Sequence, residues 1–134
     1  MSIDANKQLV RTLYEQCFNH GSLELLNELL TEDFVASPGN RGRAEFAAGV
    51  AAIRAGFPDV RFELEEVFGE DERLAVRWTF QATHAGAFNG TPATGRRVTQ
   101  TGNVLYHFRG GRIARAWVQV DRLGLLQQIG ALPT

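Results

Sequence analysis

Apolar side chains recur every three or four residues over the first part of the chain, which is the period of an amphipathic helix. The first such stripe comprises Leu9, Val10, Leu13, Tyr14, Cys17 and Phe18. Asp4 stands where an N-cap is expected, and Asn19-His20-Gly21 supplies a helix stop. The pattern therefore predicts a long N-terminal helix with one buried face.

Two further helices and a short strand are predicted before residue 60. Ser22 is placed to cap a short helix that ends at residues 31–33, and residues 34–36 form the strand. The apolar residues of this second helix are Leu25, Leu26, Leu29 and Leu30. After a Gly- and Pro-containing loop, the third helix ends at Pro58-Asp59. Its apolar face comprises Phe46, Val50, Ile53 and Phe57.

From Val60 onward the apolar period shortens to about two residues, which is typical of β-strands. The predicted strands are one around Phe62 and Leu64 and three long ones over residues 73–84, 98–108 and 113–120. The turn Arg109-Gly110-Gly111-Arg112 joins the last two as a hairpin. A short C-terminal helix is predicted from the apolar residues Leu123, Leu126 and Ile129.

Each long strand has one apolar and one polar face. Helices followed by a meander of antiparallel strands indicate an α+β fold, in which we expect three helices to cover the apolar face of the sheet. Leu105 and Trp117 are apolar exceptions on the polar face. They mark a candidate surface for a homodimer.

Composition narrows the classes of partner. The length of 134 residues suits a single domain over residues 1–134. The net charge of −1 does not favour binding to nucleic acid or to an anionic membrane. We find no secretory signal and no apolar run near the roughly 20 residues that span a bilayer. The single cysteine, Cys17, excludes an intrachain disulfide. We therefore expect a cytoplasmic protein.

Several segments carry a family resemblance that runs, in order, along nearly the whole chain. They are residues 6–11, 18–21, Thr83-His84-Ala85-Gly86, 90–97, Gly111-Arg112-Ile113 and 121–130. Together they resemble the SnoaL-like polyketide cyclases of the nuclear-transport-factor-like superfamily. The resemblance implies a cone-shaped, curved, mostly antiparallel sheet packed against three N-terminal helices, with an internal apolar pocket. It also implies cofactor-free ring closure by intramolecular aldol condensation, with a His and an Asp in the pocket.

The His and Asp of that mechanism have no counterpart at the matching positions. The hairpin and the closing helix place the family's His at Val104 and its Asp at Val118. The supporting Gln and Asn fall near Gly102 and Ala36. A valine cannot exchange a proton. The resemblance therefore does not predict the cyclase mechanism for this chain.

Three polar groups remain near the apolar face. His84 continues the apolar parity of its strand, Gln100 lies on that parity in the next strand, and Asp121 falls roughly opposite Gln100. A His–carboxylate pair beside an apolar cavity would supply a general base and the group that orients it. Alternatively, Asp121 caps the C-terminal helix and His84 binds the backbone of its Gly-rich loop.

Tyr106 is the one hydroxyl in the middle of the apolar face. It is predicted either to donate a hydrogen bond to a ligand carbonyl or to be a core tyrosine with an internal partner. The candidate ligand-binding residues are Phe18, Trp78, Phe80, Gln100, Val104 and Val118. The aromatic members suit a wall for a flat apolar ligand, and their spacing suits core packing equally well.

The remaining polar and charged residues are weaker candidates for a functional site. His107 lies on the polar parity, so we expect it to point away from the pocket. Arg41 and Arg43 flank a loop, where they either meet an acidic substrate or are solvated. The histidines, cysteine and acidic residues lack the spacing of a metal site, so no metal is predicted.

We therefore hypothesise a SnoaL-like enzyme, an isomerase or lyase, that acts on a small apolar or aromatic molecule. It would use cofactor-free acid/base chemistry such as cyclisation, isomerisation or hydration. His84, Asp121 and Tyr106 are its candidate catalytic residues. The alternative is a non-catalytic binding domain for an apolar ligand. A third hypothesis is a dimerisation module that uses the sheet face around Trp117 and Leu105.

Overall fold

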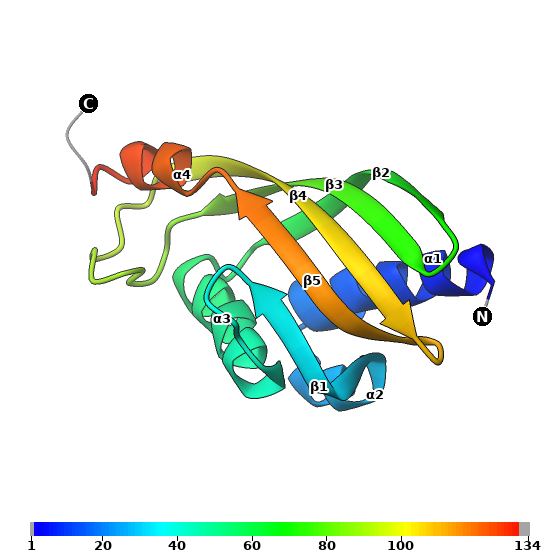
Figure 1. Ribbon diagram of the computed structural model, residues 1–134. Coiled ribbons are helices and arrows are strands. Elements are labelled where there is room, and N and C mark those ends of the chain that lie inside the picture. The colour runs from blue at the N-terminus through cyan, green and yellow to red at the C-terminus, as the bar shows by residue number, and fades with distance from the viewer. Residues whose placement is uncertain (1, 132–134) are drawn as a thin grey trace.

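Strand pairing in the sheet brings the last strand of the chain beside the first. The structure, a computed structural model, describes residues 2–131. The strands are β1 (Leu30–Ser37), β2 (Arg61–Glu70), β3 (Arg73–Thr83), β4 (Arg97–Arg109) and β5 (Arg112–Val120). They form one sheet of order β1-β5-β4-β3-β2, with β1 parallel to β5 and all other pairs antiparallel (Figure 1). The predicted α+β fold with a mostly antiparallel sheet is confirmed.

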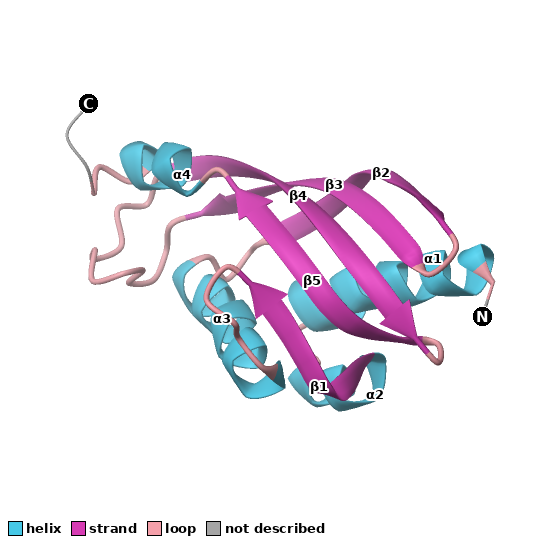
Figure 2. Cartoon of the chain, in the orientation of Figure 1, coloured by secondary structure: helices cyan, strands magenta, loops and turns pink. Residues whose placement is uncertain are grey.

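The helices cover one face of this curved sheet (Figure 2). They are α1 (Ile3–Thr12), its π-helical continuation η1 (Leu13–Asn19), the 3-10 turn η2 (Leu23–Leu25), α2 (Leu26–Leu29), α3 (Arg43–Gly56) and α4 (Arg122–Gln128). The N-terminal helix packs on β2 at one edge, α3 packs on β1 at the other, and α4 packs on β4. The concave face is thus enclosed from both edges. No described helix is long and apolar enough to cross a membrane.

The first two helices differ from the sequence prediction at their boundaries. Ser2, not Asp4, caps α1, because the Ser2 hydroxyl accepts a hydrogen bond from the Ala5 amide at 3.1 Å. The second helix ends at Leu29, and Leu30 already belongs to β1. Leu30 is fully buried opposite Ile113. The pairing of Leu30 with β5 therefore ends the helix one residue earlier than the spacing of the leucines predicts.

The C-terminal helix buries a stripe that was only partly predicted. Leu125 and Ile129 are buried, whereas Leu123 is 59% exposed. The side chain of Gln128 fixes this orientation, because its amide oxygen accepts from the Thr99 N–H and its amide nitrogen donates to the Thr99 carbonyl, each at 2.8 Å. The Gln128 side chain therefore bonds to both backbone groups of Thr99, as a neighbouring strand would, and attaches the helix to the start of β4.

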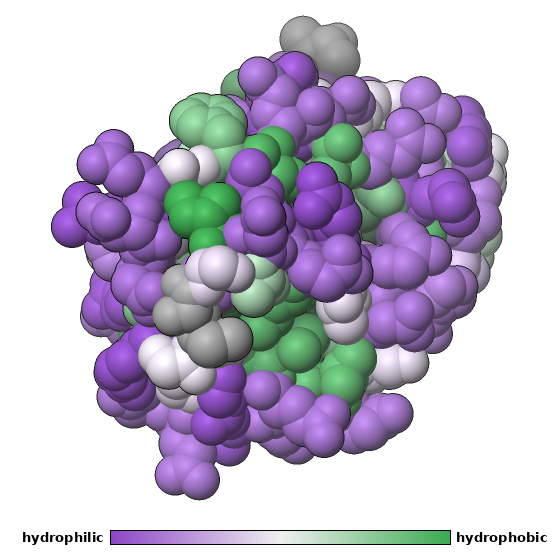
Figure 3. All heavy atoms as spheres, turned by 90° about the vertical axis from the view of Figure 1, so that its right-hand side faces the viewer, coloured by the Kyte–Doolittle hydropathy of each residue, from purple (hydrophilic) through white to green (hydrophobic). Residues whose placement is uncertain are grey.

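The two faces of the sheet have the predicted polarity. Inward-facing side chains on β3 and β4 are buried in strict alternation with outward-facing ones. Leu105 and Trp117 pair directly across β4 and β5 on the outer face, where they are 39% and 37% exposed. The side of the molecule turned toward the viewer in Figure 3 is mostly hydrophilic, with one hydrophobic area below its centre and smaller ones around it.

Candidate functional site

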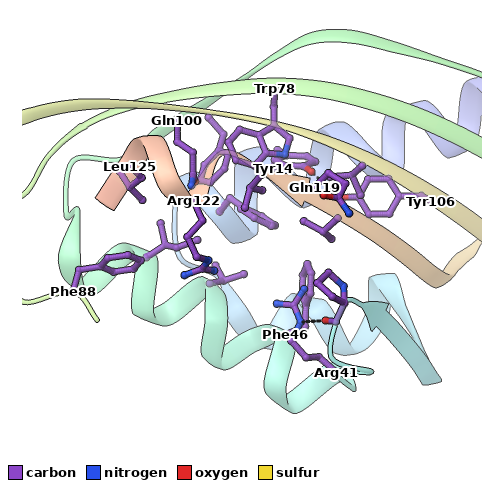
Figure 4. A pocket seen from close by; sticks show the side chains of 18 residues that line it. Tyr14, Arg41, Phe46, Trp78, Phe88, Gln100, Tyr106, Gln119, Arg122 and Leu125 are labelled. Carbon is purple, nitrogen blue, oxygen red and sulfur yellow. Dashed lines mark hydrogen bonds between the residues drawn. The ribbon is translucent and has the colours of Figure 1, made fainter. Parts of the chain in front are cut away.

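A pocket of about 450 Å³ lies between the concave face of the sheet and the helices (Figure 4). Tyr14 and Phe18 come from η1, and Phe46, Val50 and Ile53 come from α3. Strands β3, β4 and β5 supply the opposite wall, and α4 closes one end. The volume falls within the range of about 300–1,000 Å³ that is typical of small-molecule sites.

Aromatic rings in contact with one another form the apolar wall. Tyr14 stacks on Phe18 at a centroid distance of 4.6 Å, and Phe62 meets Phe18 at 4.9 Å and Trp78 at 4.7 Å. Phe18 and Trp78 line the pocket. Phe80 does not, because it is fully buried behind the wall against Phe57, Phe62 and Trp78. Of the three aromatic residues selected from the sequence, two therefore face the cavity.

The absence of a side chain at Gly102 shapes this wall. Gly102 pairs with Trp78 across β3 and β4. A Cβ atom at Gly102 would lie 2.4 Å from the Trp78 ring, which is closer than nonbonded carbons approach. The indole therefore lies flat over the glycine.

Two tyrosines form a buried pair at the inner part of the pocket. The hydroxyl oxygens of Tyr14 and Tyr106 are 2.6 Å apart, and both residues line the pocket. Burial is the largest cause that raises the pKa of each phenol, well above 10.0 for Tyr14. The charge and hydrogen bond of Tyr106 add to the rise for Tyr14, and Trp78 acts in the opposite direction. Both hydroxyls are therefore neutral donors at ordinary pH.

Val104 and Val118 face each other in the pocket. They form a directly opposed pair between β4 and β5, and both line the cavity. Among residues 2–131, no Asp, Glu, His or Lys lines this pocket. The polar side-chain groups that do so are the two tyrosine hydroxyls, the indole N–H of Trp78, Gln100, Gln119, Arg41 and Arg122.

His84 lies outside the pocket lining, contrary to the expectation for a catalytic base. Its side chain is fully buried against Phe57, and its Nδ1 accepts from the Thr94 amide at 3.2 Å and lies 2.9 Å from the Thr94 hydroxyl. Its Nε2 has no hydrogen-bond partner within the described chain. The structure thus gives His84 a role in fixing the loop after β3.

Asp121 is also absent from the pocket lining, and it does not contact His84. Its carboxylate accepts the Gly124 amide at 2.9 Å and caps α4. Its carbonyl accepts from the Gln100 side chain at 3.3 Å, so the expected proximity of Gln100 and Asp121 is present through the backbone. The predicted His–carboxylate pair does not form, because both side chains are held by local backbone groups.

His107 points away from the pocket, as its strand parity predicts. Its ring contacts Trp117 on the outer face at a centroid distance of 4.6 Å. Burial, with the nearby cations Arg73 and Arg115, lowers its pKa. The described residues contain no group of three His, Cys, Asp or Glu that could hold a metal ion.

Sequence reasoning missed Tyr14 and Arg122 as pocket residues. Tyr14 belonged to the apolar stripe of the first helix, and only its hydroxyl distinguished it from core packing. Arg122 opens the C-terminal helix, whose place over the end of the pocket depends on the Gln128 bonds to β4. No local pattern contains that information.

Comparisons with a family model and with solved structures point to the same family and fold. A family model described as SnoaL-like polyketide cyclase matches residues 8–129. AclR from Streptomyces galilaeus is similar in structure, with a TM-score of 0.89 and 26% identity over 99% of this chain and 85% of that chain. TsrD from Streptomyces laurentii has a TM-score of 0.89 and 25% identity over 98% and 99% of the two chains.

A SnoaL-like polyketide cyclase from Agrobacterium tumefaciens is also similar, with a TM-score of 0.75 and 27% identity over 90% of this chain and 95% of that chain. No curated protein matches the chain significantly in sequence. The expected family and the cone-shaped fold are both confirmed by these matches.

Proposed function

Because the chain belongs to the SnoaL-like polyketide cyclase family, we propose that it is a small-molecule enzyme that cyclises or isomerises a mostly apolar carbonyl compound. The observation that carries this proposal is the buried Tyr14–Tyr106 pair in a mostly apolar pocket. A hydroxyl held in a water-poor site stabilises charge on a carbonyl oxygen far more strongly than water does. No cofactor is required for such a reaction.

The tyrosine pair acts as a hydrogen-bond donor and acid. One hydroxyl donates to the other across 2.6 Å, so the second keeps a hydrogen that it can donate to the substrate. The elevated pKa of both phenols keeps that hydrogen in place until negative charge develops on the bound oxygen. The pair therefore suits polarisation of a carbonyl and is poorly suited to act as a base.

The nucleophile must come from the substrate, because no carboxylate, imidazole or amine lines the pocket among residues 2–131. An enolised dicarbonyl compound provides it. In ring closure the enol carbon bonds to the polarised carbonyl carbon, whose oxygen takes a proton from the tyrosine. The enol O–H becomes a ketone and returns its proton to the tyrosine pair, so the product is an isomer of the substrate.

Turnover of a panel of enolisable aromatic dicarbonyl compounds tests this function. Conversion is followed by chromatography and mass spectrometry, with an isomer of unchanged mass as the expected product. Tyr106→Phe and Tyr14→Phe should each lower kcat by about 10²–10³-fold, the usual loss when one oxyanion donor is removed. Trp117→Phe, on the outer face, is the control and should leave turnover unchanged. Full activity in both tyrosine variants would exclude the mechanism.

A non-catalytic binding domain is the second candidate function. The facing valines Val104 and Val118 favour it, because they stand where the resemblance places the proton-transferring residues. Saturable quenching of Trp78 fluorescence in a Trp117→Phe background, by compounds that are recovered unchanged, would support binding alone. Isomer formation that depends on the tyrosines would instead support the enzyme.

A further inference from the structure

The charged side chains that line the pocket within residues 2–131 all have one sign. Arg41 and Arg122 are the charged residues that line it within the described chain, and neither forms an ion pair. Other arginines are engaged, since Arg77, Arg97 and Arg109 each pair with a carboxylate. Two unpaired guanidinium groups beside an apolar cavity favour an anionic group in the ligand.

The chain holds Arg41 in place but leaves its outer nitrogens free. Its backbone amide and carbonyl both bond to Ala36, which closes the loop between β1 and α3. Its Nε donates to the Pro38 carbonyl at 3.3 Å, and its Nη1 lies beside Gly49 of α3. Neither Nη atom has a hydrogen-bond acceptor among residues 2–131. The group is therefore oriented for a ligand at modest entropic cost.

Arg122 approaches the pocket from a different element. It is the first residue of α4, directly after Asp121, whose carboxylate is occupied by the Gly124 amide. The Arg122 side chain forms no hydrogen bond or ion pair among the described residues. Figure 4 shows Arg122 reaching into the space between α4 and α3, with Arg41 on the α3 side of the same cavity.

Arg122 and the tyrosine pair lie at different places along the pocket, whereas Arg41 lies on the β1 side, near the level of Tyr106. Strand β5 ends beside Gly102, because Val120 pairs with that residue, and Arg122 follows. Tyr106 is four residues further along β4, a distance of about 13 Å at the rise of an extended strand. A ligand that reaches both regions must be elongated.

We propose that the substrate is an elongated diketo acid whose carboxylate binds between Arg41 and Arg122 while one of its two ketone groups reaches Tyr14 and Tyr106. This inference rests on the proposed function and adds its substrate class. The arginines bind and position the ligand; the tyrosines act on its carbonyl. A carboxylate matches the planar donor pairs of a guanidinium group, and a neutral ester does not.

Binding of benzoyldecanoic acid and of its methyl ester, measured by calorimetry, tests the inference. The acid should bind about tenfold or more tightly than the ester, as expected for charge-assisted hydrogen bonds. Arg41→Gln and Arg122→Gln should each remove most of this preference while leaving ester binding unchanged. Added NaCl should weaken binding of the acid and not of the ester.

Arg11→Gln is the matched control, because Arg11 is exposed on α1 and lies outside this pocket while its substitution changes net charge equally. Equal binding of acid and ester, no binding of either, or an equal loss of preference in Arg11→Gln would overturn the inference. The readout is independent of turnover. An arginine-dependent preference without conversion of any dicarbonyl compound would therefore reject the proposed enzyme and retain the anion site.

Discussion

Tyr14 and Tyr106 can place only one hydrogen on the line between their oxygens, so the other hydroxyl hydrogen must point elsewhere. We expect that second hydrogen to be a donor for a ligand in the aromatic part of the pocket. Sequence parity alone showed Tyr106 as an inward hydroxyl. The partner hydroxyl of Tyr14, 92 positions away in the chain, turns a single donor into a shared pair.

Alkaline titration of tyrosine absorbance reports directly on this pair, because the chain contains only two tyrosines. Burial raises both pKa values above 10.0, so the folded protein should show no tyrosinate at about pH 10, where unfolded tyrosines titrate. The neutral pair stabilises the fold fully below that pH. This contribution is lost as pH rises through the folded pKa values.

The control is the same titration in denaturant, in which both phenols should ionise near their ordinary pKa. A folded protein in which one phenol titrates normally would mean that this tyrosine is accessible to water. The buried pair would then be absent in solution.

Substitutions at Asp121 can separate its structural role as a helix cap from a catalytic role. Asp121→Ala should cost about 1 kcal/mol of unfolding free energy, the usual value of an N-cap, and Asp121→Asn should cost little because its oxygen still accepts the Gly124 amide. Chemical denaturation measures both. Isomer formation by Asp121→Asn at the native rate is expected, and a large loss of kcat in that stable variant would restore Asp121 as a catalytic residue.

At the scale of elements, the predictable part of the fold is the part encoded by local periodicity. Alternation located the four antiparallel strands to within a few residues, and their parity placed Trp78, Val104, Val118 and Tyr106 on the pocket side. The prediction is wrong at positions where a contact distant in sequence determines the secondary structure. Leu30 continues the helical spacing of the leucines before it, but it belongs to β1 because it pairs with Ile113.

The candidate site was less predictable than the fold for the same reason. The position of Arg122 depends on how α4 attaches to β4, and the apparent His84–Asp121 pair disappears once each side chain finds a backbone partner nearby. Residue type and parity identify which face a group occupies. They do not show which of two neighbouring polar atoms it binds.

Gly102 provides a test of how β3 and β4 shape the pocket together. Gly102→Ala should lower the unfolding free energy by about 1–3 kcal/mol, because its Cβ must displace the Trp78 ring. In a Trp117→Phe background, where Trp78 is the remaining tryptophan, its emission should shift to the red as the ring moves toward water.

The control is Gly49→Ala within α3. A Cβ there makes only ordinary contact with Arg41, and alanine is the better helix former by roughly 0.5–1 kcal/mol. Gly102→Ala with unchanged stability and emission would show that the indole does not lie over the glycine in solution.

At the scale of the whole molecule, the outer face of the sheet is the surface that we expect a second copy of the chain to cover. Trp117 and Leu105 form its apolar pair, and Arg115 stacks over the Trp117 ring at 4.8 Å. Trp117→Arg should convert a dimer to a monomer in sedimentation analysis, because it places a second cation beside Arg115. A wild-type monomer, or a variant that stays dimeric, would reject this interface.

The parallel pairing of β1 with β5 has a consequence for how the protein is made. Leu30 leaves the ribosome long before its partner Ile113, and Tyr14 long before Tyr106. Strands β2 to β5 can pair with sequence neighbours as they emerge, but β1 has no place in the sheet until residues 112–120 follow. Strand β1 must therefore stay outside the sheet until the last strand has been synthesised. Nascent chains are consequently expected to depend on chaperones until the last strand is complete.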